Sequence, residues 1–155
     1  MQLTRQADYA IRALLHLSVV EPGEVVQTKE IAASQDIPEK YLPTIMRTLA
    51  RAGLVRTLRG NQGGVMLSRD PADIDLLEAI EAIEEPILLN RCLRAKGECG
   101  RDELCPVYPV WAEIQESVIS RLKSTSFADL AADGGFSAEP SRGWQLSKAR
   151  GKVPA

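Results

Sequence analysis

Histidine and aromatic residues are scarce in this sequence of 155 residues. Phe, Trp and Tyr make up 5% of the chain, and His16 is the only histidine. The sequence also lacks a Gly-rich phosphate loop and any pattern of Ser, His and Asp that is typical of nucleophilic catalysis. Because neither kind of motif is present, no catalytic chemistry is indicated, and we do not expect an enzyme.

Long apolar runs are also absent. No stretch approaches the ~18 apolar residues that indicate a membrane-spanning helix, and the N-terminus has no apolar signal core. We therefore expect a cytoplasmic protein without membrane contact. The 45% apolar composition is sufficient for a core, and the length suits one compact domain with an appendage.

Charge is nearly balanced overall but unevenly distributed. Nineteen basic and 21 acidic side chains give a net charge of −2, which argues against a protein that coats nucleic acid non-specifically. Residues 38–59 contain five cations and one anion, a local charge of +4, whereas residues 71–90 contain six anions and no cation, a local charge of −6. One face can therefore attract phosphate while the whole protein stays soluble.

Apolar residues at helical spacing predict three helices in the first part of the chain. The first covers residues 4–20, and the second covers residues 29–35 with Thr28 as its N-cap. The third follows Pro38 and ends at Gly53, with a buried stripe formed by Leu42, Ile45, Met46 and Leu49. Its polar face carries Lys40, Thr44, Arg47, Thr48 and Arg51. Pro43 conflicts with a regular helix here, so either the helix starts later than Pro38 or its first turn is distorted.

A β-hairpin is predicted directly after the third helix. Residues 54–58 and 65–67 have the pattern of two strands, and the Gly-rich segment 59–64 forms the turn. Two short helices, a tight turn and a hairpin in this order indicate a winged helix-turn-helix, in which Arg59, Asn61 and Gln62 can reach a phosphate or the minor groove. The alternative is an ordinary basic helix and hairpin with solvated charges. The order of the elements favours a partner that is double-stranded DNA.

Two further helices are predicted beyond the hairpin. One extends from Pro71 to about Glu84, with acidic residues on a solvated face and an inward face formed by Leu76, Leu77, Ile80 and Ile83. The other is long and extends from Pro106 to about Ser124, with an apolar stripe formed by Val107, Val110, Trp111, Ile114, Val118 and Leu122. Such a helix commonly packs against its copy in a homodimer, although packing on its own domain is an alternative.

The fold that we expect is mostly α with a small β-wing: a winged helix-turn-helix plus a long dimerisation helix. The segment Ser126–Asp129 resembles a capping box that opens one more short helix, to Ala132. We assign residues 1–70 to the DNA-binding domain and residues 71–132 to the cysteine-containing loop and the dimerisation helix. Residues 133–155 are rich in Gly, Ser, Pro, Lys and Arg and are expected to form a disordered tail.

All three cysteines lie in one polar loop. Cys92, Cys99 and Cys105 are separated by six and five residues. A disulfide would leave one thiol over and does not suit a chain without a secretory signal, and the Cys-x2-Cys pairs that are usual in structural zinc sites are missing. Thiolates in a long loop suit an iron–sulfur cluster, but zinc and free or redox-active thiols remain alternatives.

Several segments of this chain resemble the Rrf family of bacterial transcription regulators. They are the N-terminal Met-Gln-Leu-Thr, Asp8-Tyr-Ala, Lys29-Glu-Ile-Ala, Gly53-Leu-Val, the wing pattern Arg59-Gly…Gly63-Gly64, and the three cysteines. The resemblance covers residues 1–132. It implies a homodimeric winged-helix repressor in which an iron–sulfur cluster near the dimer interface alters operator affinity, in response to nitric oxide, iron supply or redox state. Of the cluster types, [4Fe–4S] is expected in preference to [2Fe–2S].

The resemblance also implies which residues meet DNA. Lys40, Thr44, Arg47, Arg59 and Asn61 fall where family members contact their operators. With the neighbouring Thr28, Tyr41 and Arg51, they form the predicted DNA-binding set. Lys40 and Pro43 replace residue types that IscR-like members use on the recognition helix, so their operator sequence does not transfer to this chain.

The fourth cluster ligand also follows from the resemblance. IscR-like members have a histidine three residues beyond the third cysteine, where this chain has Tyr108. NsrR-like members use an aspartate on the first helix of the other subunit, and Asp8 matches that residue. We therefore expect Cys92, Cys99, Cys105 and Asp8 to bind the cluster. An alternative for Asp8 is a carboxylate that only stabilises the helix N-terminus; His16, Tyr108 or a bound small molecule are alternatives for the ligand.

Overall fold

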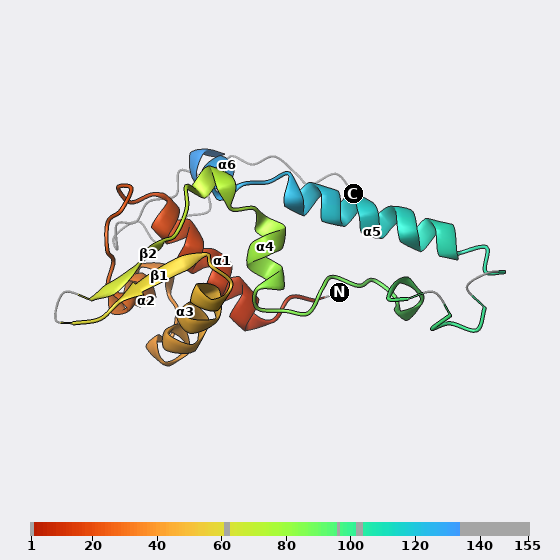
Figure 1. Cartoon of the computed structure of the whole chain (residues 1–155), viewed down its shortest axis with the longest axis horizontal. Coiled ribbons are helices and arrows are strands. Elements are labelled where there is room, and N and C mark those ends of the chain that lie inside the picture. Colours follow the sequence, from red (N-terminus) through yellow and green to blue (C-terminus); the bar gives the residue numbers. More distant parts are fainter. Residues whose placement is uncertain (1, 61–62, 96, 102–103, 134–155) are drawn as a thin grey trace.

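The computed structural model describes residues 2–60, 63–95, 97–101 and 104–133. Figure 1 shows the elements in chain order: α1 (Arg5–Ser18), α2 (Thr28–Gln35), η1 (Glu39–Tyr41), α3 (Leu42–Arg51), β1 (Val55–Leu58), β2 (Gly64–Leu67), η2 (Pro71–Asp73), α4 (Leu76–Glu81), η3 (Arg91–Leu93), α5 (Tyr108–Lys123) and α6 (Phe127–Asp133). This mostly helical fold with a two-stranded antiparallel wing confirms the predicted fold class. The predicted tail lies outside the described residues from residue 134 onward. None of the described helices is long and apolar enough to cross a membrane.

Helix α1 lies at the centre of the winged helix-turn-helix. Thr4 caps its N-terminus, because the Thr4 hydroxyl accepts a hydrogen bond from the backbone N–H of Ala7 at 3.3 Å. Ala10, Ala13 and Leu14 are completely buried, and α2, α3, α4, α6 and β2 all contact this helix. Burying a leucine such as Leu14 contributes about 1.5–3 kcal/mol. The same helix therefore supports both the winged-helix part and the C-terminal helices.

The segment between α2 and α3 accounts for Pro43. Residues 39–41 form the 3₁₀ turn η1, and α3 begins at Leu42. Pro43 therefore occupies the first turn of α3, where a missing N–H removes no intrahelical hydrogen bond. The recognition helix starts later than Pro38. A second expectation needs correction: Thr28 is the first residue of α2 and not its cap, because Gln27 holds the N-cap position and makes no side-chain capping bond.

The wing is a hairpin that is held against the rest of the domain. Val55 pairs with Leu67 and Leu58 with Gly64 in the antiparallel register. Val65 also forms an isolated bridge with Val26, so the segment before α2 extends the sheet by one residue. A side chain at Gly64 would meet the backbone carbonyl of Val26. Glycine is needed there because two backbones approach closely.

The acidic helix is shorter than predicted. Helix α4 ends at Glu81 and not near Glu84, and Ile80 is its fully buried apolar anchor. The expectation that its carboxylates serve only for solvation is wrong for three of them. Asp75 caps α4 by accepting a hydrogen bond from the N–H of Glu78 at 2.8 Å, and Glu78 pairs with Arg69. The carboxylate of Glu84 accepts a hydrogen bond from the N–H of Thr4 at 2.8 Å.

The two last helices differ in how they are packed. Helix α6 starts at the predicted capping box, because Ser126 and Asp129 exchange hydrogen bonds through their side chains and backbone N–H groups. Those bonds lower the pKa of the Asp129 carboxyl. Phe127 of α6 is completely buried in the common core. Helix α5, by contrast, contains no fully buried residue and projects away from the winged-helix part (Figure 1).

Candidate DNA interface and cysteine loop

The recognition helix α3 has two clearly separated faces. Leu42, Ile45, Met46 and Leu49 are buried in the core, as predicted. Thr44, Arg47 and Arg51 of the predicted DNA-binding set are exposed on the opposite face. Packing of the apolar face fixes the helix, so the exposed cations are presented on a rigid element. A rigid helix with two cations on its open side has the chemistry that phosphate contact requires.

The turn before α3 presents Lys40 and Tyr41. Both are exposed, and the ammonium of Lys40 lies 5.1 Å from the centroid of the Tyr41 ring. The Tyr41 ring in turn lies 5.7 Å from the ring of Tyr9 on α1. These side-chain contacts connect the turn before α3 to α1. Thr28, which the sequence placed in the same set, is half-buried in the first turn of α2.

The wing presents further basic groups. Arg59 is exposed directly after β1, and the following Gly60 has a φ of 115°, which glycine adopts without strain. Asn61, also predicted to contact DNA, lies outside the described residues. The predicted set leaves out Arg56, which is exposed on β1. The sequence could have identified Arg56, because it lies in the cationic segment 38–59 and on the predicted strand that follows the recognition helix.

Asp8 lies in the first turn of α1, and its carboxylate already has a partner. Its Oδ2 is 2.7 Å from Nη2 of Arg12, one helical turn further on, and about half of the Asp8 side chain is exposed. The other guanidinium nitrogen of Arg12 donates to the backbone carbonyl of Gln35 at 3.4 Å, at the end of α2. The Arg12 guanidinium thus connects the Asp8 carboxylate to the helix-turn-helix.

His16 is a structural residue. It is completely buried, and its Nδ1 lies 3.2 Å from Nε2 of Gln35. Burial lowers the pKa of the His16 imidazole, although the carboxylates of Glu30 and Glu24 act in the opposite direction. Its Nε2 atom has no hydrogen-bond partner within the described part of the chain. A neutral imidazole enclosed between α1 and α2 is not available to a metal on the surface.

The three cysteines occupy separate turns of one loop. Cys92 lies in η3 and Cys105 lies three residues before α5, with Cys99 between them; all three are free thiols and half-buried. The loop is tied to α5 where it begins, because the N–H of Leu89 donates to the side chain of Gln115 at 3.1 Å. Three free thiols on one loop are a donor set that suits an iron–sulfur cluster. Within the described residues of one chain, however, no three Cys, His, Asp or Glu side chains are gathered closely enough to hold a metal ion.

The long helix next to this loop has an uncovered apolar face. Val110, Trp111 and Ile114 have exposed fractions of 51%, 37% and 43%, unusually high for large apolar side chains that form one stripe. A shallow groove follows this stripe towards the C-terminal end of the helix, lined by Val110, Glu113, Ile114, Ser117, Val118, Arg121 and Leu122. In the N-terminal half of α5, this face does not pack on its own domain, because Val110, Trp111 and Ile114 are exposed.

Comparison with known proteins decides the family. The sequence matches the family Rrf2, described as "Iron-dependent Transcriptional regulator", over residues 3–133. This chain belongs to the Rrf2 family. As an Rrf2-family member it is a DNA-binding transcription regulator and not an enzyme. The resemblance on which the expectations were based is thereby confirmed.

The relatives that are similar to this chain carry different names. The chain is 34% identical over 134 residues to the HTH-type transcriptional regulator NsrR of Geobacillus kaustophilus, covering 86% of this chain and 91% of that protein. It is 32% identical over 130 residues to IscR of Xenorhabdus nematophila, covering 84% and 79%.

The solved structures that are similar to this chain include those of an IscR and a CymR protein. IscR of T. potens has a TM-score of 0.68 at 27% identity and covers 86% of this chain and 88% of that one. CymR, described as the global cysteine regulator of B. subtilis, has a TM-score of 0.70 at 26% identity and covers 85% and 97%. The family and the fold follow from these comparisons.

Proposed function

We propose that this regulator is a cytoplasmic homodimer whose operator affinity depends on an iron–sulfur cluster. Cys92, Cys99 and Cys105 of one subunit and Asp8 of the other would hold the cluster. The observation that carries the proposal is the loop of three free, half-buried thiols beside an uncovered apolar helix face. Bound there, the cluster would supply a centre that reacts with nitric oxide or oxidants and whose assembly depends on the supply of iron.

The thiols and the helix face support each other. The loop begins with a hydrogen bond to Gln115 and ends where α5 begins. Gathering the three thiols would therefore reshape a segment that is anchored on α5 at both ends. If α5 is the dimerisation helix, a change in the loop reaches the subunit interface directly. This is the physical requirement for linkage between a cluster and a symmetric DNA site.

In the proposal, three cysteines leave one iron of the cluster without a protein ligand, and a residue of the partner subunit supplies it. One chain contributes three thiols that are not gathered into a metal-binding group with a carboxylate or imidazole among the described residues. Asp8 is half-exposed on α1 and can face a second subunit. An oxygen ligand beside three thiolates is the weakest donor for iron of this type. It would leave one exchangeable position at which a signal molecule can react.

DNA recognition is assigned to the first part of the chain. We propose that residues 1–70 contact the operator and that residues 71–132 carry the cluster loop and the dimerisation helix. Arg47 and Arg51 on α3 and Arg59 on the wing are exposed cations on neighbouring elements. A recognition helix in the major groove with a wing on the adjacent backbone uses such groups for phosphate contacts, which provide most of the affinity.

The proposal is tested by purification without oxygen. The protein is expected to be brown, to contain iron and sulfide, and to lose its visible absorption on exposure to nitric oxide, with a parallel change in DNA affinity. Each of Cys92→Ala, Cys99→Ala and Cys105→Ala is expected to lower the iron content and to bring the affinity to that of the cluster-free protein. Leu104→Ala is the matched control, because Leu104 lies in the same loop with an exposed fraction of 92%.

Two outcomes contradict the proposal. A colourless protein that contains zinc, or no metal, identifies a zinc-based or thiol-based regulator of the same fold. A brown protein in which the three cysteine variants keep wild-type operator affinity shows that the cluster does not control DNA binding.

A further inference from the structure

The base of the wing is joined to the C-terminal end of the recognition helix. Ser68, the residue after β2, donates its backbone N–H to the carbonyl of Leu54 at 3.1 Å. Its hydroxyl donates to the carbonyl of Gly53, which follows α3. The end of β2 therefore moves together with both the wing and the recognition helix.

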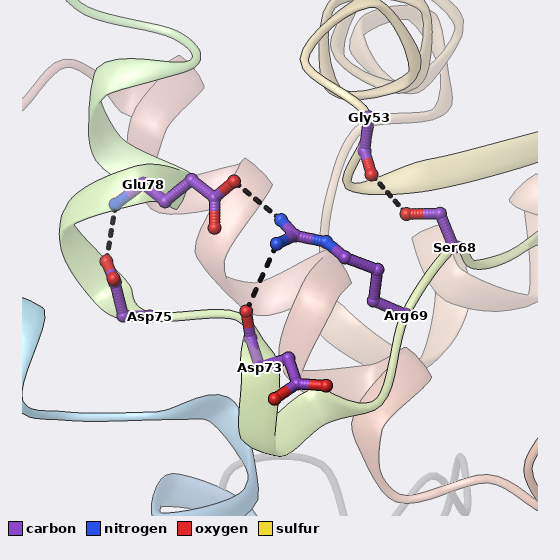
Figure 2. A network of polar contacts seen from close by, with 6 residues as sticks. All are labelled: Gly53, Ser68, Arg69, Asp73, Asp75 and Glu78. Atoms are coloured by element: carbon purple, nitrogen blue, oxygen red, sulfur yellow. Dashed lines mark hydrogen bonds and ion pairs between the residues drawn. The ribbon is translucent and has the colours of Figure 1, made fainter.

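The next residue, Arg69, reaches in the opposite direction. Figure 2 shows its guanidinium extending from the end of β2 to the turn at Asp73 and to α4. One nitrogen donates to the Asp73 carbonyl at 3.3 Å, and the other lies 2.5 Å from Oε1 of Glu78. The planar fork of arginine is suited to bridging two acceptors at once. The bridge links the wing and α3 to the start of α4.

The start of α4 is in turn bonded to the end of the long helix. The N–H of Leu76 donates to the carbonyl of Thr125 at 3.0 Å, and Asp75 forms a backbone bridge with Ser126. Thr125 is the second residue after α5, since the helix ends at Lys123 and Ser124 is its C-cap. A continuous path of hydrogen bonds therefore extends from α5 through α4 and Arg69 to the wing and α3.

The solvent exposure of the ion pair between Arg69 and Glu78 indicates a role other than folding stability. Arg69 and Glu78 have side-chain exposures of 41% and 37%, and ion pairs this exposed contribute little to folding. We propose that Arg69 is a positioning residue, which holds the wing and recognition helix at a fixed orientation to α4 and the dimerisation helix. The inference rests on the proposed homodimer, because a fixed orientation sets the separation of two recognition helices on DNA.

The competing explanation is that Arg69 itself contacts phosphate. The two explanations differ in what Glu78 does. If Arg69 binds DNA, removing Glu78 frees its guanidinium and leaves the affinity unchanged or higher. If Arg69 positions the wing, removing either partner has the same effect on the affinity. The salt dependence also differs, because loss of a phosphate contact lowers the slope of log affinity against log salt by about one.

The test uses the full-length protein purified without oxygen and a duplex selected from a randomised library with the wild-type dimer. Arg69→Met and Glu78→Met are each expected to weaken binding to that duplex by about 2- to 30-fold, the range set by one exposed ion pair per subunit. The double variant is expected to be no weaker than the weaker single variant, and the salt slope is expected to stay at the wild-type value. The charge swap Arg69→Glu with Glu78→Arg is expected to bind more tightly than either single reversal.

Glu81→Met is the matched control, because it makes the same charge change on the same helix without involving Arg69. Wild-type affinity in both single variants overturns the inference, as does weakening in Arg69→Met alone with a reduced salt slope. Equal weakening by Glu81→Met also overturns it, since the charge of α4 alone would then be responsible. A failure of the proposed function is visible separately: the wild-type protein would then be a monomer or would bind the selected duplex equally with and without iron.

Discussion

Asp8 can serve as an iron ligand only if its carboxylate shares or leaves its ion pair with Arg12. The two groups are 2.7 Å apart, one helical turn from each other, and the pair is partly exposed to solvent. Such a pair stabilises a helix by only about 0.3–0.5 kcal/mol. A bond to iron is far stronger than this, so the ion pair is no obstacle to ligation. Leaving it also frees the Arg12 guanidinium, which contacts Gln35 at the end of α2.

The prediction for this residue is that Asp8→Ala changes the cluster and not only the helix. The protein purified without oxygen is expected to remain coloured, because three thiolates still hold a cluster. Its absorption is expected to change, and it is expected to lose iron to a chelator faster than the wild type. Time-resolved absorption of the two proteins in the presence of a chelator measures both effects.

Arg12→Ala is the control for this prediction, because it removes the ion pair and keeps the carboxylate. If Asp8 acts only through the ion pair and the helix dipole, both variants lose stability by roughly half a kcal/mol and keep the wild-type spectrum. That result would rule out ligation by Asp8. A changed spectrum in Asp8→Ala alone assigns the ligand.

At the scale of elements, periodicity and capping predicted most of the fold. The stripe of Leu42, Ile45, Met46 and Leu49 is buried as expected, and the Ser126–Asp129 capping box opens α6. The exact start of α3, at Leu42, could not be predicted, because Pro43 fits either the first turn of a helix or a distorted turn. The 3₁₀ turn at residues 39–41 decides between them.

The wing gives a prediction at this scale. Arg59→Ala is expected to weaken binding to every duplex by about the same factor and to lower the salt slope by about one, since an exposed arginine at the tip of a wing contacts phosphate. Binding titrations at several salt concentrations, with a selected and a non-specific duplex, measure this. Arg91→Ala is a matched control, because Arg91 is an exposed arginine in the cysteine loop. A loss of discrimination at one base pair, with non-specific affinity intact, would instead show that Arg59 reads a base.

At the scale of the whole molecule, contacts between distant segments were the part that the sequence did not predict. The carboxylates of residues 75–84 follow a solvated helical face in the sequence, yet Glu78 binds Arg69 and Glu84 binds the N–H of Thr4, which is 80 residues away. Periodicity reports which face of a helix is apolar, but it does not report which element lies opposite a polar side chain. Cys92, Cys99 and Cys105 could be proposed as cluster ligands from the sequence because all three lie in one segment, whereas the proposal of Asp8 as fourth ligand required a family resemblance.

Periodicity likewise does not report which surface of α5 meets a second subunit. Ile114 lies in the middle of the uncovered stripe of α5 and lines its groove. In a two-fold symmetric dimer formed through this face, Ile114→Glu would place two buried carboxylates near each other, which is strongly unfavourable. We expect the dimer dissociation constant to rise by at least about 30-fold, the effect of losing a central interface residue. Sedimentation equilibrium measures the change directly.

Ser120→Glu is the matched control, because Ser120 is exposed on the same helix, lies outside the groove, and acquires the same charge. It is expected to leave the protein dimeric. In Ile114→Glu, binding to a full two-fold symmetric duplex should weaken much more than binding to one half-site, because each winged helix stays folded while the connection between the two is lost. A dimer of wild-type strength in Ile114→Glu would mean that the subunits meet through another surface, and the partner subunit would then have to bring Asp8 to the cysteines by a different route.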